Sequence, residues 1–362
     1  MNAQEKIGQM FMIGFDGTHL PQETKKLIKD YKIGGVILFR RNVQDPSQLF
    51  DLCKEIQSLS KGHPPFIAVD HEGGRVCRLP PPFTQFPNSL ALGRRKSYSL
   101  TYSMAEVMAK ELKAVGINMN MAPVLDVNTN PLNPVIGDRS FGDSPTRVSS
   151  LGLAVVVGLQ DHGMIACGKH FPGHGDTSMD SHEKLPTVNH SIERLQEVDL
   201  KPFVHAISNG LSSVMTAHVL YPSLDAKYPA TLSKKITHTL LRQSLGFEGV
   251  VVSDDMEMGA ISHHWEMGKA SVKAILAGVD LLLICHESKR QIEGMESVFR
   301  AVDSGKIPQH RLEASLKRIL LLKDRFLKKE KGWTKKQAIQ TVGCSQHRHI
   351  SERINTQVAL PS

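Results

Sequence analysis

One segment of the sequence holds an unusually dense group of reactive side chains. Residues 168–186 read GKHFPGHGDTSMDSHEKLP, and the glycines together with Pro172 predict a long loop rather than a helix. Asp180 and His182 are two residues apart, so in extended backbone both side chains leave the same face and can share a hydrogen bond. A carboxylate beside an imidazole orients the ring and fixes its tautomer. Asp180 and His182 are therefore a candidate general acid/base pair.

A second segment supplies two adjacent carboxylates. Residues 249–260 read GVVVSDDMEMGA, in which an apolar run ends at Asp254 and Asp255. A carboxylate held at the end of a buried strand can attack the anomeric carbon of a sugar and form a covalent glycosyl-enzyme. Either aspartate can instead cap the helix that follows. The chemistry of the residues does not choose between the two.

A third segment combines an aspartate with two arginines. Residues 66–80 read FIAVDHEGGRVCRLP, where Asp70 ends an apolar run and Arg75 and Arg78 follow a pair of glycines. Aspartate can bind two sugar hydroxyls, and arginine is a planar donor of several hydrogen bonds. These residues are candidate sugar-binding groups, with a purely structural ion pair as the alternative.

The elements that must position these residues follow an alternating pattern. Short apolar runs recur, each followed by a stretch of helical period, as in a parallel sheet with crossover helices. The predicted strands are Met12–Phe15, Gly35–Phe39, Phe66–Asp70, Asn118–Asp126, Met164–Lys169, Ser213–His218, Val250–Asp254 and Val279–Cys285. The predicted helices are Pro21–Asp30, Pro46–Leu59, Leu100–Val115, Thr146–His162, Ile192–Asn209, Ser233–Leu245, Glu266–Leu276 and Ser288–Val302.

Eight such units predict an α/β fold of the (β/α)₈ TIM-barrel type, whose active site is built at the C-terminal ends of the strands. An open doubly wound sheet is the competing architecture, but no GxGxxG motif follows the first strand. Polar residues gather behind the predicted strands, namely Asp16, Arg40, Arg41, Asn42, Asp70, His71, Glu72, Asp126, Lys169, His170, His218, Asp254, Asp255 and His286. Asp126 and Arg139 belong to a long irregular stretch, residues 118–142, of a kind that usually has a function inside a barrel.

The composition limits the classes of partner. The net charge of +8 arises largely in residues 311–336, which hold ten Lys or Arg against three Asp or Glu. Leu and Ile recur there at helical spacing, which predicts an outer helix with a solvated face. No recognition module for nucleic acid accompanies the charge, so we expect no nucleic-acid partner.

The sequence also indicates where the protein acts. The N-terminus lacks the features of a signal peptide, and no apolar run is long enough to span a bilayer, so we expect no membrane partner. The five cysteines are scattered and lack the short paired spacings of zinc sites or disulfide frameworks. We therefore expect reduced thiols and a cytoplasmic location.

Six blocks in the same order as in a known family cover most of the chain. They are VDHEGGRVCR (69–78), APVLDV (122–127), GDRSFG (137–142), KHFPGHGDTSMDSH (169–182), MTAHV (215–219) and VVSDDMEMGA (251–260). Together these blocks resemble the β-N-acetylglucosaminidases of glycoside hydrolase family 3. The resemblance implies a retaining exo-hydrolase that removes terminal non-reducing N-acetylglucosamine, in bacteria typically from peptidoglycan fragments (muropeptides) during cell-wall recycling.

The resemblance also assigns roles to residues. Asp254 matches the nucleophile of the family, and His182 with Asp180 matches an acid/base dyad on a mobile loop. The sugar-binding positions of the family are matched by Asp70, Arg78, Arg139, Lys169 and His170. The implied protein needs no cofactor and no metal, acts on a small-molecule glycan, and is expected to be a monomer.

The resemblance raises two further points. A neutral imidazole repels phosphate less than a carboxylate does, so phosphorolysis beside hydrolysis is an alternative activity. Action on another sugar is a second alternative within the family. Some family members carry a second α/β domain, and residues 340–362 resemble its opening. We therefore expect a catalytic barrel at 1–332 and, at 333–362, a helical tail that resembles the start of that domain.

The residue types alone are also compatible with two other functions. A metal-dependent hydrolase is one, because barrels often hold metals near strand ends and several histidines lie there: His170, His174, His182, His218 and His286. A non-catalytic sugar-binding protein is the other. That protein would not need both a nucleophile and an acid/base.

Overall fold

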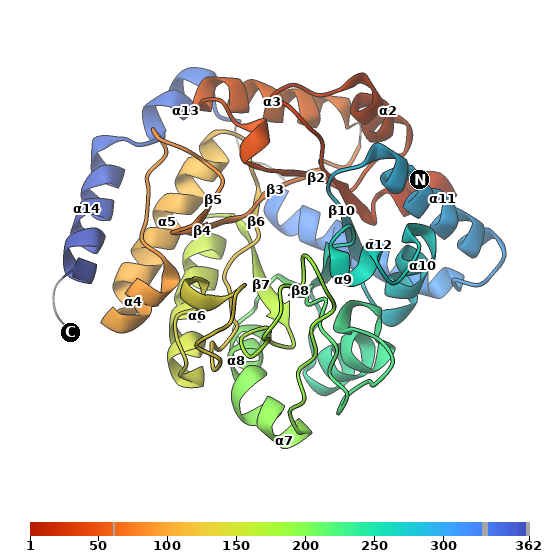
Figure 1. Ribbon diagram of the computed structural model, residues 1–362. Helices are drawn as coiled ribbons and strands as arrows, with labels where there is room; N and C mark the ends of the chain where they lie inside the picture. Colours follow the sequence, from red (N-terminus) through yellow and green to blue (C-terminus); the bar gives the residue numbers. More distant parts are fainter. Residues whose placement is uncertain (61, 328–331, 360–362) are drawn as a thin grey trace.

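Eight parallel strands form a closed barrel at the centre of the molecule (Figure 1). The computed structural model describes residues 1–60, 62–327 and 332–359. In order around the barrel the strands are β1 (Phe11–Ile13), β10 (Leu281–Ile284), β9 (Val250–Asp255), β8 (Ser213–Thr216), β7 (Ile165–Phe171), β6 (Met119–Asn120), β3 (Phe66–Val69) and β2 (Gly35–Leu38). Each of the eight predicted runs overlaps one of them, and the predicted (β/α)₈ fold is confirmed.

One strand is much shorter than predicted. The sequence indicated Asn118–Asp126, but β6 ends at Asn120. Pro123 has no N–H to donate, which interrupts the ladder. Its carbonyl still accepts a 3.0 Å hydrogen bond from the amide of Lys169. The irregular backbone that follows carries Asp126, which is fully buried.

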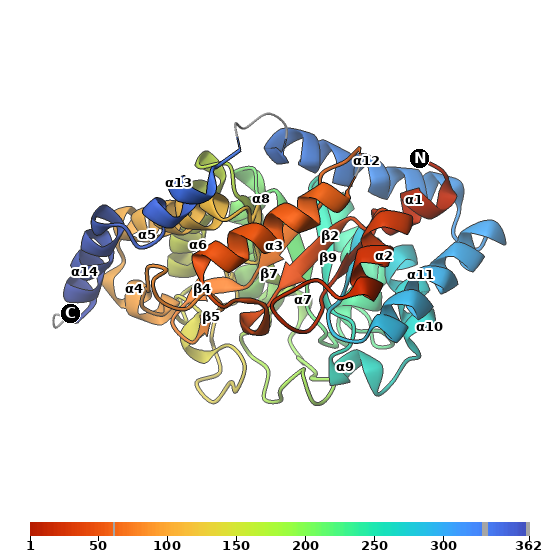
Figure 2. The ribbon, with the colours of Figure 1, turned by 90° about the horizontal axis from the view of Figure 1, so that it is seen from above.

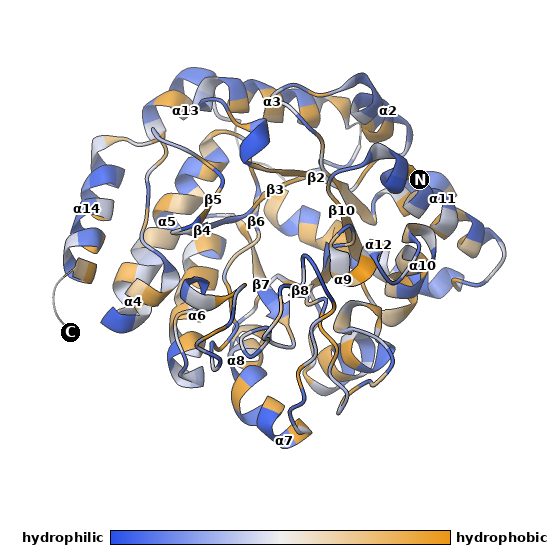
Figure 3. Cartoon of the chain, in the orientation of Figure 1, coloured by the Kyte–Doolittle hydropathy of each residue, from blue (hydrophilic) through white to orange (hydrophobic). Residues whose placement is uncertain are grey.

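The crossover helices surround the barrel, and apolar residues gather on the strands and on the inner helix faces (Figure 3). The principal helices are α2 (Gln22–Asp30), α3 (Pro46–Leu59), α5 (Tyr98–Ala114), α6 (Pro145–Asp161), α7 (Ile192–Arg194), η3 (Leu195–Asp199), α8 (Lys201–Ser208), η5 (Lys235–Ser244), α10 (Met267–Ala277), α11 (Ser288–Asp303) and α12 (Gln309–Leu327). Local sequence sets several starts. Asp45, for example, caps α3 by accepting a hydrogen bond from the amide of Gln48, and Pro46 occupies the first turn.

Several small elements were not predicted. A hairpin of β4 (His71–Gly73) and β5 (Val76–Cys77) follows β3, and its turn uses Gly73 and Gly74, both with positive φ. The short helices α1 (Ala3–Gly8), α4 (Ser89–Arg95) and α9 (Gly259–Ser262) are the others, together with 3₁₀ turns at Arg40–Asn42, Gly137–Arg139 and Ala230–Leu232. The long loops extend from one end of the barrel, and α12 crosses the opposite end (Figure 2).

The C-terminal segment packs against the outside of the barrel. Helix α13 (Lys335–Thr341) lies against α3 and α5, and α14 (Ser345–Ala359) lies against α4 and α5. The buried carboxylate of Glu111 in α5 joins them, because it accepts 2.8 Å hydrogen bonds from the amide of Gly343 and from Nδ1 of His347. Residues 328–331 and 360–362 of the predicted outer helix and tail lie outside the described residues. No described helix is both long and apolar enough to cross a membrane.

Candidate active site

A cavity of about 590 Å³ opens at the C-terminal end of the barrel. All eight residues that the sequence proposed for catalysis or sugar binding line this cavity: Asp70, Arg78, Arg139, Lys169, His170, Asp180, His182 and Asp254. They come from β7, β9 and the segments that follow the strands, as expected for a barrel enzyme. The fold therefore gathers residues that are up to 184 positions apart in the sequence, from Asp70 to Asp254.

A network of charged side chains, called the charged floor below, lies along one side of the cavity and consists of Asp70, Glu72, Arg139 and Lys169. Nζ of Lys169 lies 2.7 Å from Oδ1 of Asp70 and 2.7 Å from Oε1 of Glu72. Glu72 also binds Arg139 through two hydrogen bonds, from Nε at 2.9 Å and from Nη2 at 2.8 Å. Arg78 lies farther off, with Nη2 3.9 Å from Oδ2 of Asp70. The sequence had assigned no role to Glu72, which links two of the predicted sugar-binding residues.

These groups keep one another ionised despite their burial. Burial alone raises the pKa of Glu72, but Arg139 and Lys169 outweigh it and hold that pKa below its ordinary value. Burial lowers the pKa of Lys169, but Asp70 and Glu72 leave it above its ordinary value. The arrangement is a fixed array of charges, suited to binding sugar hydroxyls without rearrangement.

A second buried network surrounds Asp126. Its Oδ2 lies 2.7 Å from Nδ1 of His170, and its Oδ1 accepts hydrogen bonds from the backbone amides of His170, at 3.1 Å, and His174, at 2.7 Å. Burial raises the pKa of Asp126, but His170 and these hydrogen bonds bring it below its ordinary value. Asp126 thus fixes the orientation of His170 and directs Nε2 of that ring toward Arg139, 3.5 Å away.

The two adjacent aspartates of β9 have different surroundings. Oδ1 of Asp255 accepts hydrogen bonds from the amides of Glu257 at 3.1 Å and Cys285 at 3.3 Å, and its Oδ2 lies 3.1 Å from Nε2 of His286. Asp255 therefore stabilises the turn after β9 and joins it to the end of β10. Asp254 accepts one 2.8 Å hydrogen bond, from the amide of Asp255. The geometry thus leaves the carboxylate of Asp254 the freer of the two to meet a substrate.

The pKa of Asp254 suits an anionic nucleophile. Burial raises the pKa, but the nearby His170 and His218 lower it, and the net pKa lies below the ordinary value. His218 is itself held in place, with Nδ1 2.8 Å from Oγ1 of Thr231 and Nε2 2.9 Å from the carbonyl oxygen of Asp255. His182, in the loop after β7, also lowers the pKa of Asp254.

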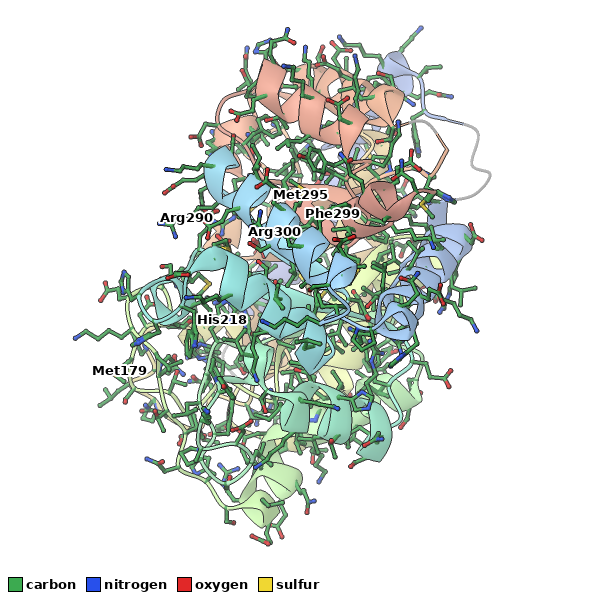
Figure 4. All side chains as sticks on the ribbon, turned by 90° about the vertical axis from the view of Figure 1, so that its right-hand side faces the viewer. Met179, His218, Arg290, Met295, Phe299 and Arg300 are labelled. Atoms are coloured by element: carbon green, nitrogen blue, oxygen red, sulfur yellow. The ribbon has the colours of Figure 1, made fainter. Side chains whose placement is uncertain are left out.

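Asp180 and His182 form the predicted pair. Oδ1 of Asp180 lies 2.7 Å from Nδ1 of His182 and accepts a 2.8 Å hydrogen bond from the amide of the same residue. This contact occupies Nδ1 and leaves Nε2 to meet a substrate. The side chains are 36% and 64% exposed, so the pair stands at the rim of the cavity. Figure 4 shows the neighbouring Met179 at the outer edge of the loops, with His218 farther inside.

Some residues of the site had no role in catalysis or sugar binding assigned from the sequence, and His174 was considered only as a metal ligand. His174, Ser181, Glu257 and Met258 line the cavity, and Glu72 organises its charged floor. The spacing of Glu72 offered a signal, because it lies two residues after Asp70 on extended backbone and such residues share a face. His174 and Ser181 offered none, since their contact depends on how the loop folds back.

The histidines considered for a metal site bind different partners. His170 contacts Asp126, His174 contacts Ser181, His182 contacts Asp180, His218 contacts Thr231, and His286 contacts Asp255. Among the residues that the structure describes, no group of three or more His, Cys, Asp or Glu side chains is placed to hold a metal ion.

Comparisons with known proteins agree with this fold and site. Residues 2–322 match the glycosyl hydrolase family 3 N terminal domain. The chain is 37% identical to "Beta-hexosaminidase A" of Pseudoalteromonas piscicida, with 93% of this chain and 60% of that protein covered. It therefore spans less than two thirds of that relative.

Two solved structures are also similar. A family 3 β-N-acetylglucosaminidase from Paenibacillus sp. str. FPU-7 is 42% identical with a TM-score of 0.93, over 99% of this chain and 69% of that one. NagZ from Neisseria gonorrhoeae, solved with N-trifluoroacetyl-D-glucosamine, is 33% identical with a TM-score of 0.79, over 97% and 98% of the two chains. The chain therefore belongs to glycosyl hydrolase family 3, as its motifs predicted, and is a glycoside hydrolase.

Proposed function

We propose that this protein is a retaining exo-β-N-acetylglucosaminidase that removes terminal non-reducing N-acetylglucosamine from β-linked glycans. One observation carries the proposal. A single cavity holds a half-buried, anionic Asp254 and, on a separate loop, the Asp180–His182 pair, so a nucleophile and a proton donor face the same space. The name of the similar Paenibacillus protein supports the choice of sugar, and the name of the Pseudoalteromonas piscicida protein supports hexosaminidase activity.

The reaction follows from these positions. The Asp254 carboxylate attacks the anomeric carbon and forms a covalent glycosyl ester, while Nε2 of His182 gives its proton to the departing glycosidic oxygen. Asp180 holds the ring through Nδ1 and stabilises its charged form. His182 then removes a proton from water, which attacks the ester and releases the sugar with its original configuration. The glycosidic bond breaks as the ester forms, and the ester breaks as water adds, so the Asp254 carboxylate is regenerated.

The remaining residues are proposed to hold the sugar. Asp70, Lys169 and Arg78 present an acceptor and two donors on one side of the cavity, and His170 extends this surface. Arg139 lies behind them with two of its donors engaged by Glu72. Such fixed and ionised partners bind hydroxyls without paying the entropy of ordering them first.

The proposed natural substrates are muropeptides in the cytoplasm. Peptidoglycan fragments that end in N-acetylglucosamine are the substrates implied by the resemblance to bacterial enzymes of cell-wall recycling. Within this proposal, residues 1–332 form the catalytic barrel, and residues 333–362 correspond to the start of the second domain that some relatives carry.

Trapping of the intermediate tests the proposal. A 5-fluoro derivative of N-acetylglucosaminyl fluoride keeps the acetamide. The added fluorine slows both formation and hydrolysis of the ester, whereas the good leaving group speeds its formation, so the ester accumulates. We expect a stable adduct on Asp254 in peptide mapping by mass spectrometry. An adduct on another residue would reassign the nucleophile. Inversion of configuration in NMR of the natural reaction would exclude the retaining mechanism.

A further inference from the structure

The loop that carries the acid/base pair is fastened to the helix that follows the nucleophile strand. β9 leads through residues 256–258 into the short helix α9, which begins at Gly259. The amide of Gly259 donates a 2.9 Å hydrogen bond to the carbonyl of His182, and the amide of Ala260 donates one of 3.1 Å to the carbonyl of Ser181. Two consecutive amides after Asp254 therefore hold two consecutive carbonyls of the loop.

Only glycine permits this approach at position 259. A Cβ atom added to Gly259 would lie 2.7 Å from the carbonyl oxygen of His182 and 2.7 Å from that of Glu183. Both are backbone atoms, which cannot rotate out of the way as a side chain can. The φ angle of Gly259 lies outside the left-handed region, so an alanine there is not strained by its own backbone. A larger residue must therefore move the loop away from α9.

A second contact holds the same loop from inside. Ser181 is buried between the two exposed members of the pair, and its Oγ lies 3.0 Å from Nε2 of His174. Nδ1 of His174 lies 2.8 Å from Oγ1 of Thr177, whose hydroxyl donates to the carbonyl of His174 at 3.2 Å. The Thr177 oxygen therefore accepts a hydrogen bond from Nδ1–H, and Nε2 accepts one from the Ser181 hydroxyl.

This pattern requires a neutral imidazole at His174. Burial and the neighbouring His170 lower the pKa of His174 to about 4, so the ring stays neutral above that pH. The backbone of His174 is held in place as well, because its amide donates a hydrogen bond to Asp126. Ser181 is thus tied to the same carboxylate that orients His170.

We propose that Gly259 and His174 are positioning residues, which set the distance from the His182 proton donor to Asp254 by fastening Ser181 and the loop backbone. The proposal rests on the acid/base role proposed for His182. That role needs the donor held across the glycosidic bond from the nucleophile. The exposed side chains of the pair have little packing of their own to fix them, whereas the residue between them is buried and bonded.

The test uses leaving groups that differ in their need for a proton. An aryl glycoside with a dinitrophenolate leaving group departs without protonation, whereas a phenyl glycoside or a disaccharide needs the acid. The value of kcat/KM reports the step in which the leaving group departs. For Gly259→Ala we expect kcat/KM to fall about tenfold or more on phenyl N-acetylglucosaminide, within the 10²–10⁴-fold contribution of a positioned acid. The dinitrophenyl substrate should change little.

Graded variants extend the test. Gly259→Val should give a larger loss than Gly259→Ala on the phenyl substrate, because its side chain displaces the loop farther. Ser181→Ala removes the contact to His174 without adding bulk, and should show the same dependence on the leaving group with a smaller loss. The Ser181→Ala variant keeps the proposal testable if the Gly259→Val variant does not fold.

Two reference variants separate the possible failures. Gly268→Ala places the same methyl group at the start of α10, where it meets the side chain of Ser297 instead of the loop, and should affect all leaving groups alike. His182→Asn should show the full dependence on the leaving group. If His182→Asn shows it but the Gly259 and Ser181 variants lose activity uniformly or not at all, the positioning proposal is wrong. If His182→Asn itself shows none, the acid/base assignment fails instead.

Discussion

Nζ of Lys169 and Oε1 of Glu72 lie 2.7 Å apart, and both side chains are at least 97% buried. Lys169 was proposed from the sequence as a sugar-binding residue, but Glu72 is the group that keeps its ammonium in place. Glu72 also holds Arg139 through two hydrogen bonds, so one carboxylate offsets two cations. The charged floor of the cavity therefore depends on a residue that is not itself part of the cavity lining.

Glu72→Gln should weaken both stability and sugar binding. The substitution leaves Lys169 and Arg139 with one fewer buried negative charge, and loss of one partner from a buried pair costs about 3–5 kcal/mol. We expect a lower free energy of unfolding in urea and a KM for N-acetylglucosaminides that rises more than kcat falls. Glu106→Gln is the control, because Glu106 pairs with Lys110 at the surface of α5 and should change stability by less than about 1 kcal/mol. Equal effects of the two substitutions would contradict this account.

Asp254→Asn and Asp255→Asn should separate chemistry from structure. An amide cannot form the glycosyl ester, so Asp254→Asn should abolish turnover and retain the fold. Asp255→Asn disturbs the contacts with His286 and with the amides of Glu257 and Cys285. It should lower stability by about 1–3 kcal/mol and leave measurable activity. Circular dichroism and turnover of an aryl N-acetylglucosaminide give both readouts, and loss of turnover confined to the Asp255 variant would reverse the assignment.

The difference between these aspartates shows which features of the site can be predicted from the sequence and which cannot. Apolar runs between polar loops were enough to predict the strands, because burial inside a barrel demands them, and the order of strands then placed the site. Asp254 and Asp255 share one strand end, however. They are distinguished by the contacts of Asp255 with Cys285 and His286, which follow β10, and with Glu257 in the turn after β9. A contact between elements distant in sequence leaves no local pattern.

The loop residues make the same point at closer range. The spacing of Asp180 and His182 was sufficient to predict their hydrogen bond, since extended backbone puts alternate side chains on one face. The same alternation turns Ser181 inward, but what it meets there depends on the fold of residues 173–177. The apolar residues around Pro123 predicted a longer strand, but the proline interrupts the hydrogen-bond ladder and β6 ends at Asn120.

Phosphate should be tested as an alternative acceptor of the glycosyl group. Nε2 of a neutral His182 carries no negative charge to repel an anion, so the geometry of the pair admits phosphate as well as water. If phosphorolysis operates, the yield of N-acetylglucosamine 1-phosphate should rise with phosphate concentration at constant ionic strength, as ³¹P NMR would detect. Sulfate at equal ionic strength is the control. A yield that stays at zero over the whole range identifies the enzyme as a hydrolase alone.

A buried lysine at the other end of the barrel should make stability depend on pH. Lys323 of α12 is 1% exposed, its Nζ lies 2.7 Å from Oε1 of the neutral Gln9, and the ammonium stands 4.8 Å from the ring centre of Phe66. Burial lowers the pKa of Lys323 to about 7. In the unfolded chain the pKa of lysine is about 10.4. Between these values the unfolded chain binds a proton that the folded chain has released.

The sign of the effect follows from this difference. Unfolding takes up a proton between pH 7 and pH 10, so the contribution of Lys323 to stability increases as the pH rises through that window. Below pH 7 the folded protein must bury the ammonium. Lys323→Met should therefore exceed the wild type in stability by the most below pH 7, by a margin on the order of a few kcal/mol, and the margin should shrink toward pH 10. Urea unfolding of both proteins at several pH values measures the difference directly. Lys317→Met, on the exposed face of the same helix, should give a margin that does not vary with pH. A pH-independent margin for Lys323→Met as well would mean that this lysine stays charged in the folded protein.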